Sequence, residues 1–306
     1  MELHDKVLPI TEFARLRHRM WLTKTYGEKK YPLPDAASAL TPYHFTNLWR
    51  ELDRNSVYLF NDVQQPNGDD LAGSVLDTLR FRVFNKIETN EAMLAEFGSL
   101  DAAFANGKKL HSFLKEREGN FTGAYIRCPS LERLCDETQN NRLNPLADEI
   151  AELLQAGDGR GVRKKVTELY SIGSFLADQL AMDLTWIGGP VDAATGKNAE
   201  NLFTPGFGPG AKRGQAYCLE TGQGTSQEVL ESIRQVFASE PLPRVYGTPV
   251  GFNGRELEHT LCEYQKHVRV ARSVTRAGGK MRVFNQQRDP NRKVVAALPY
   301  TWKDAK

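Results

Sequence analysis

The apolar positions along this chain recur mostly every three or four residues, which is the spacing of one face of a helix. Residues 10–26 show this spacing at Phe13, Leu16 and Met20. The same pattern continues through most of the chain and predicts a mainly α fold. Further helices are predicted over residues 43–60, 69–86, 90–97, 100–118, 147–155, 161–171, 173–187, 226–238 and 254–267.

A stretch rich in Gly and Pro, residues 188–214, interrupts the helical pattern and predicts a long loop. Two short strand-like runs, 282–284 and 294–298, fit a hairpin or an extended arm. No composition shift marks an independent linker. We therefore expect a single domain over residues 1–306, within which two lobes and a basic tail would lie at 1–160, 161–285 and 286–306.

The composition, with 40% hydrophobic and 25% charged residues, is that of an ordinary globular protein. No apolar run approaches the roughly 20 residues of a membrane span, and the N-terminal residues lack a signal-peptide pattern. The cysteines at 128, 135, 218 and 262 form no close pair, which argues against a zinc ribbon or a disulfide framework. We expect a cytoplasmic protein that contacts no membrane.

The net charge of +2 is unevenly spread. Residues 241–306 hold 13 Lys and Arg against 5 Asp and Glu, a net charge of +8, whereas the first 240 residues sum to −6. A basic C-terminal part suits a phosphate backbone as partner. The alternative is a solvated basic tail without a partner.

The densest polar stretch is Tyr43–Arg54, which the pattern predicts to be helical. On a helix, Asn47, Arg50 and Arg54 would share one face, because they lie three and four residues apart. Arginine and asparagine are the side chains that fork onto phosphates and base edges. The alternative is a ladder of ion pairs within the helix, in which Arg50 pairs with the neighbouring acidic residues.

A second polar group lies near the end of the helix predicted over 69–86. Arg82, Asn85 and Thr89 would share a face there. This arrangement suits substrate contacts. The alternative is an ordinary helix end at which Asn85 is the stop signal.

The stretch Leu169–Ala177 resembles the helix-hairpin-helix of DNA repair glycosylases. In that motif a hairpin turns on a glycine, here Gly173, and the next helix directs free N–H groups at a DNA phosphate. Asp183 on the following helix and Asp192, which is 19 residues after the glycine, are candidates for a catalytic carboxylate. The alternatives are a buried helix partner for Asp183 and a turn residue for Asp192.

The block Gly208–Gly214 contains three glycines, a proline and two cations, Lys212 and Arg213. As a loop it would present N–H groups and positive charge to an anion. It does not follow the GxxxxGK[ST] order of a P-loop, which argues against a nucleotide kinase in this chain alone. The alternative is a plain linker.

The helix predicted over 254–267 brings His259, Glu263 and Lys266 to one face. The histidine and glutamate could handle a proton while the lysine holds a phosphate. Because no third ligand accompanies them, no metal is expected. The alternative is a structural histidine.

Five blocks occur here in the order in which they occur in one known family: 43–54, 82–89, 175–184, 208–214 and 259–266. The chain therefore resembles the α-glutamyl/putrescinyl thymine pyrophosphorylases. That family also includes the helical domain attached to 5-hydroxymethyluracil DNA kinases, and its members are interpreted as amino acid:DNA transferases, largely of bacteriophages. Two positions depart from the family pattern, Ala211 and Gln265.

The resemblance implies an all-helical, helix-hairpin-helix DNA-glycosylase-like fold and a transferase that acts on a hypermodified thymine. Its partners would be double-stranded DNA with a phosphorylated hydroxymethylated pyrimidine, and a free amino acid or polyamine, with a DNA kinase as a further candidate. No cofactor is implied. The phosphate would leave, and the amine would add to the exposed methylene of a flipped base. Such a protein would work in the cytoplasm of an infected host cell.

The resemblance implies catalytic roles for Asp183, His259, Glu263 and Lys266. Substrate-binding residues would be Asn47, Arg50, Asp53, Arg54, Asn85, Gln179 and Arg213, and Trp49 or Phe45 would stack on the base. DNA-binding residues would be Gly173, Gly208, Gly210, Lys212, Gly214 and Arg269.

Two alternatives remain open at this point. A DNA glycosylase acting on a modified pyrimidine would leave abasic sites without any added amine. A non-catalytic DNA-binding module would show salt-sensitive binding and no change of nucleoside mass.

Overall fold

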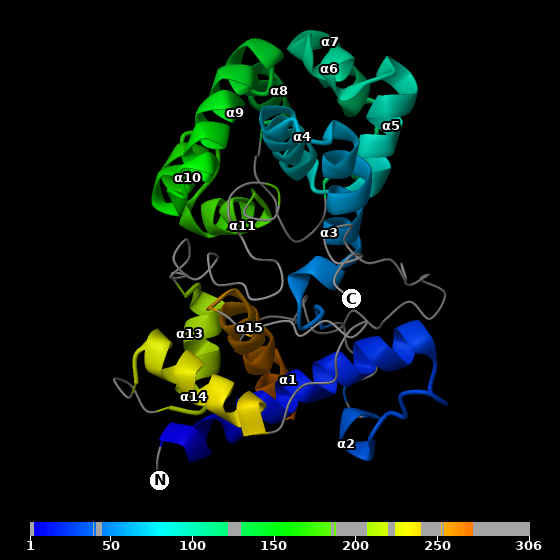
Figure 1. The fold of residues 1–306 in the computed structure, drawn as a ribbon. Coiled ribbons are helices and arrows are strands. Elements are labelled where there is room, and N and C mark those ends of the chain that lie inside the picture. Colours follow the sequence, from blue (N-terminus) through cyan, green and yellow to red (C-terminus); the bar gives the residue numbers. More distant parts are fainter. Residues whose placement is uncertain are drawn as a thin grey trace. The chain divides into compact units, whose positions relative to one another are not determined.

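The computed structural model describes residues 3–38, 40, 45–121, 130–184, 187, 207–219, 224–239, 252 and 254–271 (Figure 1). These residues form helices and turns and contain no strand, which confirms the mainly α prediction. The two strand-like runs near the C-terminus and Asp192 lie outside the described residues. None of the described helices is long and apolar enough to span a membrane.

The described residues divide into two compact units. Unit 1 holds those up to Arg54 and from Phe207 onward, and unit 2 holds those from Asn55 to Ile187. The elements of unit 1 are α1 (Leu3–Tyr26), α2 (Asp35–Ser38), the 3₁₀ turn η1 (Arg50–Leu52), α13 (Pro209–Ala216), α14 (Ser226–Ser239) and α15 (Gly254–Ala271).

Unit 2 follows the chain through a longer series of helices. Three short elements precede the long helix α4: α3 (Arg54–Tyr58), the π-helical turn η2 (Leu59–Gln64) and the 3₁₀ turn η3 (Gln65–Asn67). The remaining elements are α4 (Leu71–Phe84), α5 (Ile87–Phe97), α6 (Leu100–Phe104), α7 (Gly107–Lys115), α8 (Leu131–Glu137), α9 (Asn140–Gln155), α10 (Gly159–Val166) and α11 (Ser174–Leu184).

The helix α1 is the base of unit 1, because both α14 and α15 pack against it and α13 packs against α15. The contact between α13 and α15 is unusually close. A Cβ at Gly214 would lie 2.0 Å from the Leu261 carbonyl oxygen, and one at Gly210 would lie 2.7 Å from the Cys262 Sγ. The two glycines therefore permit the helices to touch, and the prediction of a loop up to residue 214 is wrong from Pro209 onward.

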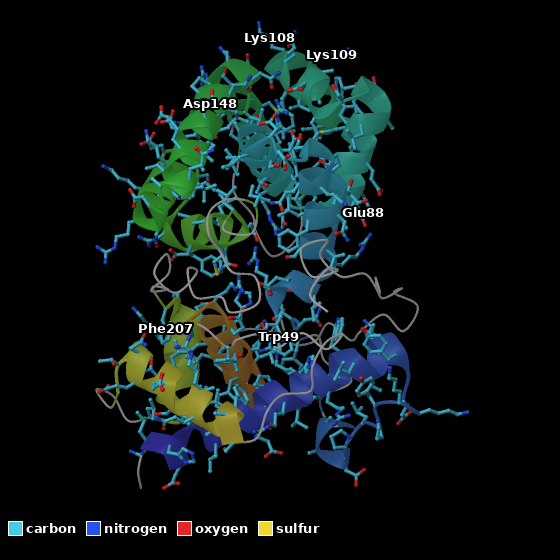
Figure 2. All side chains as sticks on the ribbon, viewed as in Figure 1. Trp49, Glu88, Lys108, Lys109, Asp148 and Phe207 are labelled. Carbon is cyan, nitrogen blue, oxygen red and sulfur yellow. The ribbon has the colours of Figure 1, made fainter. Side chains whose placement is uncertain are left out.

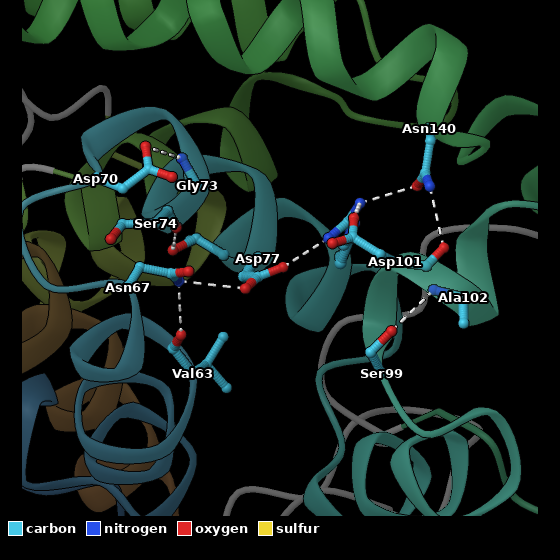
Figure 3. A network of polar contacts seen from close by, with 12 residues as sticks. Val63, Asn67, Asp70, Gly73, Ser74, Asp77, Ser99, Asp101, Ala102 and Asn140 are labelled. Atoms are coloured by element: carbon cyan, nitrogen blue, oxygen red, sulfur yellow. Dashed lines mark hydrogen bonds and ion pairs between the residues drawn. The ribbon is translucent and has the colours of Figure 1, made fainter.

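The core of unit 2 forms around α4, which contacts α9, α11 and η2. A buried arginine, Arg80, links this helix to its neighbours. Figure 3 shows its three partners, Asp77, Asp101 and Asn140. The Arg80 guanidinium pairs with Asp77 at 2.7 Å and Asp101 at 2.5 Å and donates to Asn140 Oδ1 at 2.8 Å. One cation thus joins α4, α6 and α9.

Several predicted helices have different bounds in the structure. The helix predicted over 100–118 is two helices, α6 and α7, because Asn106 caps the second by accepting the Lys109 N–H at 3.1 Å. The helix predicted over 147–155 begins earlier, at Asn140. Surface lysines 108 and 109 extend from the start of α7 (Figure 2).

Candidate functional site

The segment Phe45–Asp53 is not the helix that its pattern predicts: residues 45–49 are irregular, and η1 covers only Arg50–Leu52. Arg17 of α1 explains the difference. Its guanidinium donates to the carbonyl oxygens of Thr46 at 2.8 Å and Asn47 at 2.6 Å. In a helix those two oxygens would instead accept N–H groups four residues further on.

The side chains of the segment complete this irregular turn. Asn47 donates its amide Nδ2 to the Leu52 carbonyl at 2.8 Å, and its backbone N–H donates to Asp53 Oδ1 at 3.0 Å. Such side-chain to backbone bonds compete with helix formation. The common helical face expected for Asn47, Arg50 and Arg54 is therefore wrong, and so is the alternative of a helical ion-pair ladder.

The aromatic residues of the segment are buried, as the apolar pattern predicts. Trp49, labelled in Figure 2, is 2% exposed and packs edge-on against the ring of His18, with 4.4 Å between ring centroids. Phe45 is 4% exposed and contacts Phe13 of α1. Both rings are buried in this structure, and their stacking on a base stays a prediction.

The first turn of α15 reaches the same segment through ion pairs. Arg255 pairs with Glu51 at 2.5 Å and with Glu256 at 2.8 Å, and all three side chains are buried. Further along α15, Thr260 accepts from Arg17 at 3.3 Å. Residues 46–53 are thus held between α1 and α15, and we name these three parts together the unit 1 cluster.

His259 lies close to several cations of the unit 1 cluster. Burial and four cations, Arg50, Arg17, Arg255 and Lys266, hold its pKa well below the ordinary value. The imidazole is therefore neutral at neutral pH. Cations gathered in this way can stabilise a bound anion.

Buried polar atoms of the unit 1 cluster lack hydrogen-bond partners among the described residues. They include Trp49 Nε1, Glu51 Oε2, His259 Nδ1 and Glu263 Oε2. The other carboxylate oxygen of Glu263 accepts from Lys266 at 2.5 Å. Unmatched buried groups are rare in folded proteins and mark candidate ligand sites.

Two carboxyl groups of the cluster have raised pKa values. Burial raises the pKa of Asp53 to about 6, against the lowering effect of the Asn47 N–H, Arg50 and Arg17. Burial likewise raises the pKa of Glu51, although Arg255 opposes the change. Groups of this kind are common at sites of proton transfer.

Unit 2 contains a second buried polar group, which we name the Arg82 group. Arg82 of α4 pairs with Asp183 of α11 at 2.8 Å, and the two side chains are 7% and 2% exposed. Arg82 also donates to Asn85 Oδ1, and Asn55 donates to the Asn85 carbonyl at 2.7 Å. Asn85 adopts the left-handed conformation at the end of α4, so its role as a helix stop is confirmed.

The two helices α10 and α11 are joined by a short turn and contact each other. Ser171 in this turn has a positive φ of 63°. Gly173 is exposed immediately before α11, and its carbonyl accepts the Ala177 N–H at 3.0 Å. Gln179, by contrast, is buried within α11. The structure thus has two contacting helices with the glycine at the surface between them, and a DNA-binding helix-hairpin-helix at this place stays a prediction.

The other predicted site residues are distributed over three elements. Gly208 precedes α13, where Lys212 and Arg213 are exposed, and Arg213 Nε lies 3.5 Å from Gln265 Oε1. Arg269 is near the end of α15, and Arg54 begins α3. Because 209–216 is a helix, the expected loop that would surround an anion is not formed there.

Sequence reasoning missed three residues that hold the unit 1 cluster together: Arg17, Glu51 and Arg255. Their partners are up to 243 positions away in the chain. The sequence of α1 gives no clear signal for Arg17, because four polar residues, Arg15, Arg17, His18 and Arg19, lie between Phe13 and Leu22 and only Arg17 and His18 of these are buried. No group of His, Cys, Asp and Glu among the described residues is arranged to hold a metal.

Comparison with known proteins places these observations in a family. The model of the family described as "5-hmdU DNA kinase, helical domain" matches residues 6–276. A 5-hmdU DNA kinase of Bacillus phage SP10 is 26% identical over 280 residues, which covers 82% of this chain and 43% of that protein. This chain thus spans under half the length of that relative. No solved structure matches it. Because the family model covers most of the chain, this protein belongs to the family of 5-hmdU DNA kinase helical domains.

Proposed function

We propose that this protein acts in the hypermodification of thymine in bacteriophage DNA. It transfers the amine of an amino acid or polyamine onto phosphorylated 5-hydroxymethyluracil, and phosphate leaves. The printed name of the phage relative associates that protein with 5-hydroxymethyldeoxyuridine in DNA. The 306 residues contain no P-loop order, so in this proposal a kinase activity outside these residues supplies the phosphorylated base.

The observation that carries the proposal is the position of a neutral His259 among four cations. A phosphate that leaves carbon gains negative charge at its bridging oxygen, and cations that are already in place stabilise that charge. Arg50 and Lys266 are the cations that the sequence pattern also selects. The unmatched Nδ1 of His259 is a further polar contact for the substrate.

The exposed turn before α11 supports binding to DNA. Gly173 has no atom within 4 Å of the place where a Cβ would lie, so a backbone can approach it closely. The first N–H groups of α11 have no helical partner by construction and suit a DNA phosphate. The modified base would have to leave the stack to reach a buried cluster.

Nucleoside mass spectrometry tests the proposed function. Duplex DNA with phosphorylated 5-hydroxymethyluracil would be incubated with the protein, a pool of amino acids and putrescine. We expect a thymidine-derived nucleoside that is heavier by one amine, with one phosphate released for each. An unchanged substrate would contradict the proposal for these amines.

The same experiment separates the alternatives. Abasic sites without added amine would support a glycosylase, and salt-sensitive binding without a mass change would support a DNA-binding module. Matched variants localise the activity: Arg50→Gln removes a cation of the unit 1 cluster, whereas Lys108→Gln removes an exposed one on α7. We expect only the first to abolish phosphate release.

A further inference from the structure

Asp53 ends the turn η1, where its Oδ1 accepts a hydrogen bond and its Oδ2 has no hydrogen-bond partner among the described residues. We propose that Asp53 is the group that accepts the proton of the attacking amine. This inference rests on the proposed function and assigns its base. The sequence predicts a substrate-binding role for Asp53 and no catalytic role.

The geometry around Asp53 suits a proton acceptor. Its Oδ1 accepts the backbone N–H of Asn47 at 3.0 Å, and that contact fixes the carboxylate plane. Its Oδ2 forms no hydrogen bond or ion pair with any described residue. The neighbouring Arg50, Glu51 and Leu52 are buried, whereas the residue Asp53 as a whole keeps part of its surface exposed. Asp53 is therefore more accessible as a residue than Glu51, two positions earlier.

Two other acidic groups of the cluster are engaged with cations. Glu51 pairs with Arg255, and Glu263 pairs with Lys266. A carboxylate that is paired with a cation is a weaker base, because proton uptake would leave that cation alone. Asp53 forms no ion pair within 4.0 Å with any described residue.

Charged groups face Asp53 from each element packed against it. Arg17 of α1 and Arg50 of its own turn lower its pKa, whereas Glu263 of α15 and the dominant effect of burial raise it. The balance is a pKa of about 6. Such a carboxylate is ionised at neutral pH and is more basic than an ordinary aspartate, which suits general base catalysis.

Two candidates that the sequence favoured as bases are less suitable. Asp183 is 2% exposed and is bound to Arg82. Burial and the cations around His259 lower its pKa. A general base must accept a proton, and this environment disfavours the protonated imidazole. The latter environment suits phosphate binding instead.

The bonds and protons of the proposed step balance. The nitrogen lone pair of the amine forms a bond to the exocyclic carbon of the base. The carbon–oxygen bond to phosphate breaks, and its electron pair leaves with the phosphate. The extra proton on the new C–N nitrogen passes to Oδ2 of Asp53 and later to water.

A nucleophile without a proton tests this step. Azide can attack the same carbon and displace the same phosphate, but it has no proton to give. Asp53→Asn keeps the oxygen that accepts from Asn47 and removes the base. The matched control is Asp148→Asn, which removes the same charge from an exposed position on α9 (Figure 2).

We expect Asp53→Asn to lower kcat/KM for the amine by about 100-fold or more, which is the usual contribution of a general base. Its rate with azide should stay within about threefold of the unaltered protein, because binding and phosphate departure are unaffected. The unaltered protein should lose amine transfer as pH falls through about 6, and the variant should lack this dependence. Asp148→Asn should change neither rate.

The outcomes separate the two proposals. If the unaltered protein forms no adduct with either nucleophile, the proposed function fails. If it is active and Asp53→Asn either matches it with the amine or loses both nucleophiles equally, only the assignment of Asp53 is overturned.

Discussion

The unit 1 cluster and the Arg82 group are both buried, and both contain an arginine paired with a carboxylate. They differ in how completely their polar atoms are matched. In the Arg82 group the guanidinium contacts both Asp183 and Asn85. In the unit 1 cluster His259 Nδ1 and Glu263 Oε2 have no partner among the described residues.

This difference separates two uses of buried charge. A fully matched pair fixes the geometry of a core, and removal of one partner is costly because the other charge stays buried. Unmatched groups with altered pKa values cost stability and are retained at sites that act on a ligand. We therefore interpret the Arg82 group as structural and the unit 1 cluster as the reactive one.

The largest predicted effect breaks the matched pair. Asp183→Ala leaves the guanidinium of Arg82 buried without its carboxylate, and we expect a loss of about 3–5 kcal/mol in the free energy of unfolding. Urea denaturation at pH 7 measures it. Arg163→Ala is the control. The Arg163 side chain is 43% exposed, so its ion pair with Asp178 should contribute at most about 1 kcal/mol to stability. A cost below about 1 kcal/mol for Asp183→Ala would contradict a structural role.

The second prediction is that removal of a carboxylate from the unit 1 cluster raises the free energy of unfolding, whereas removal of Asp183 lowers it. Burial raises the pKa of folded Asp53 to about 6 from 3.8. Its ionisation therefore opposes folding, so stability is full below the unfolded pKa and is lost as pH rises through about 6. Asp53→Asn, which cannot ionise, should be more stable than the unaltered protein at pH 8, by at most about 3 kcal/mol.

Denaturation of both proteins between pH 4 and pH 8 measures this difference. The two curves should coincide near pH 4 and separate as the pH rises. The raised pKa of Glu51 is common to both proteins, so it changes both curves in the same direction. A variant that is less stable than the unaltered protein at every pH would assign Asp53 a structural role, as for Asp183.

The periodic pattern was sufficient where helices depend on local spacing. It predicted α4 and α15, and the latter carries His259, Glu263 and Lys266 at the expected positions. It failed over residues 45–49, because Arg17 takes the carbonyl oxygens that a helix would use. That competition depends on a residue of another helix, so local spacing contains no sign of it.

The glycine block shows the same limit. Gly210 and Gly214 suggest a loop by composition, but their spacing of four residues lets α13 lie against α15. The residue that requires a glycine at position 214, Leu261, is 47 positions away in the chain. The site was predicted only in part for the same reason. The sequence pattern identified His259, Glu263 and Lys266, which lie on one helix. It did not identify Glu51 and Arg255, which are brought together only by the fold.

The third prediction tests the close contact between α13 and α15, a helix of the unit 1 cluster. Gly214→Ala would place a Cβ 2.0 Å from the Leu261 carbonyl oxygen, so α13 must shift away from α15. We expect a loss of about 1–3 kcal/mol, as for other overpacked contacts. Gly173→Ala is the matched control, since nothing lies within 4 Å of its Cβ position, and it should change stability by less than about 0.5 kcal/mol. Thermal or urea denaturation of the two variants decides whether close helix contact explains the glycines.

The smallest predicted effect concerns the exposed cations, where unit 1 and unit 2 can be compared directly. Lys212 on α13 lies in the block that the sequence associates with DNA, whereas Lys109 on α7 does not. If Lys212 contacts one phosphate, Lys212→Ala should lower the slope of log affinity against log salt by about 1, and Lys109→Ala should leave it unchanged. Equilibrium binding to duplex DNA at several salt concentrations measures both slopes. Equal slopes in the two variants would remove Lys212 from the interface. A reduced slope for Lys109→Ala alone would assign the DNA contact to unit 2.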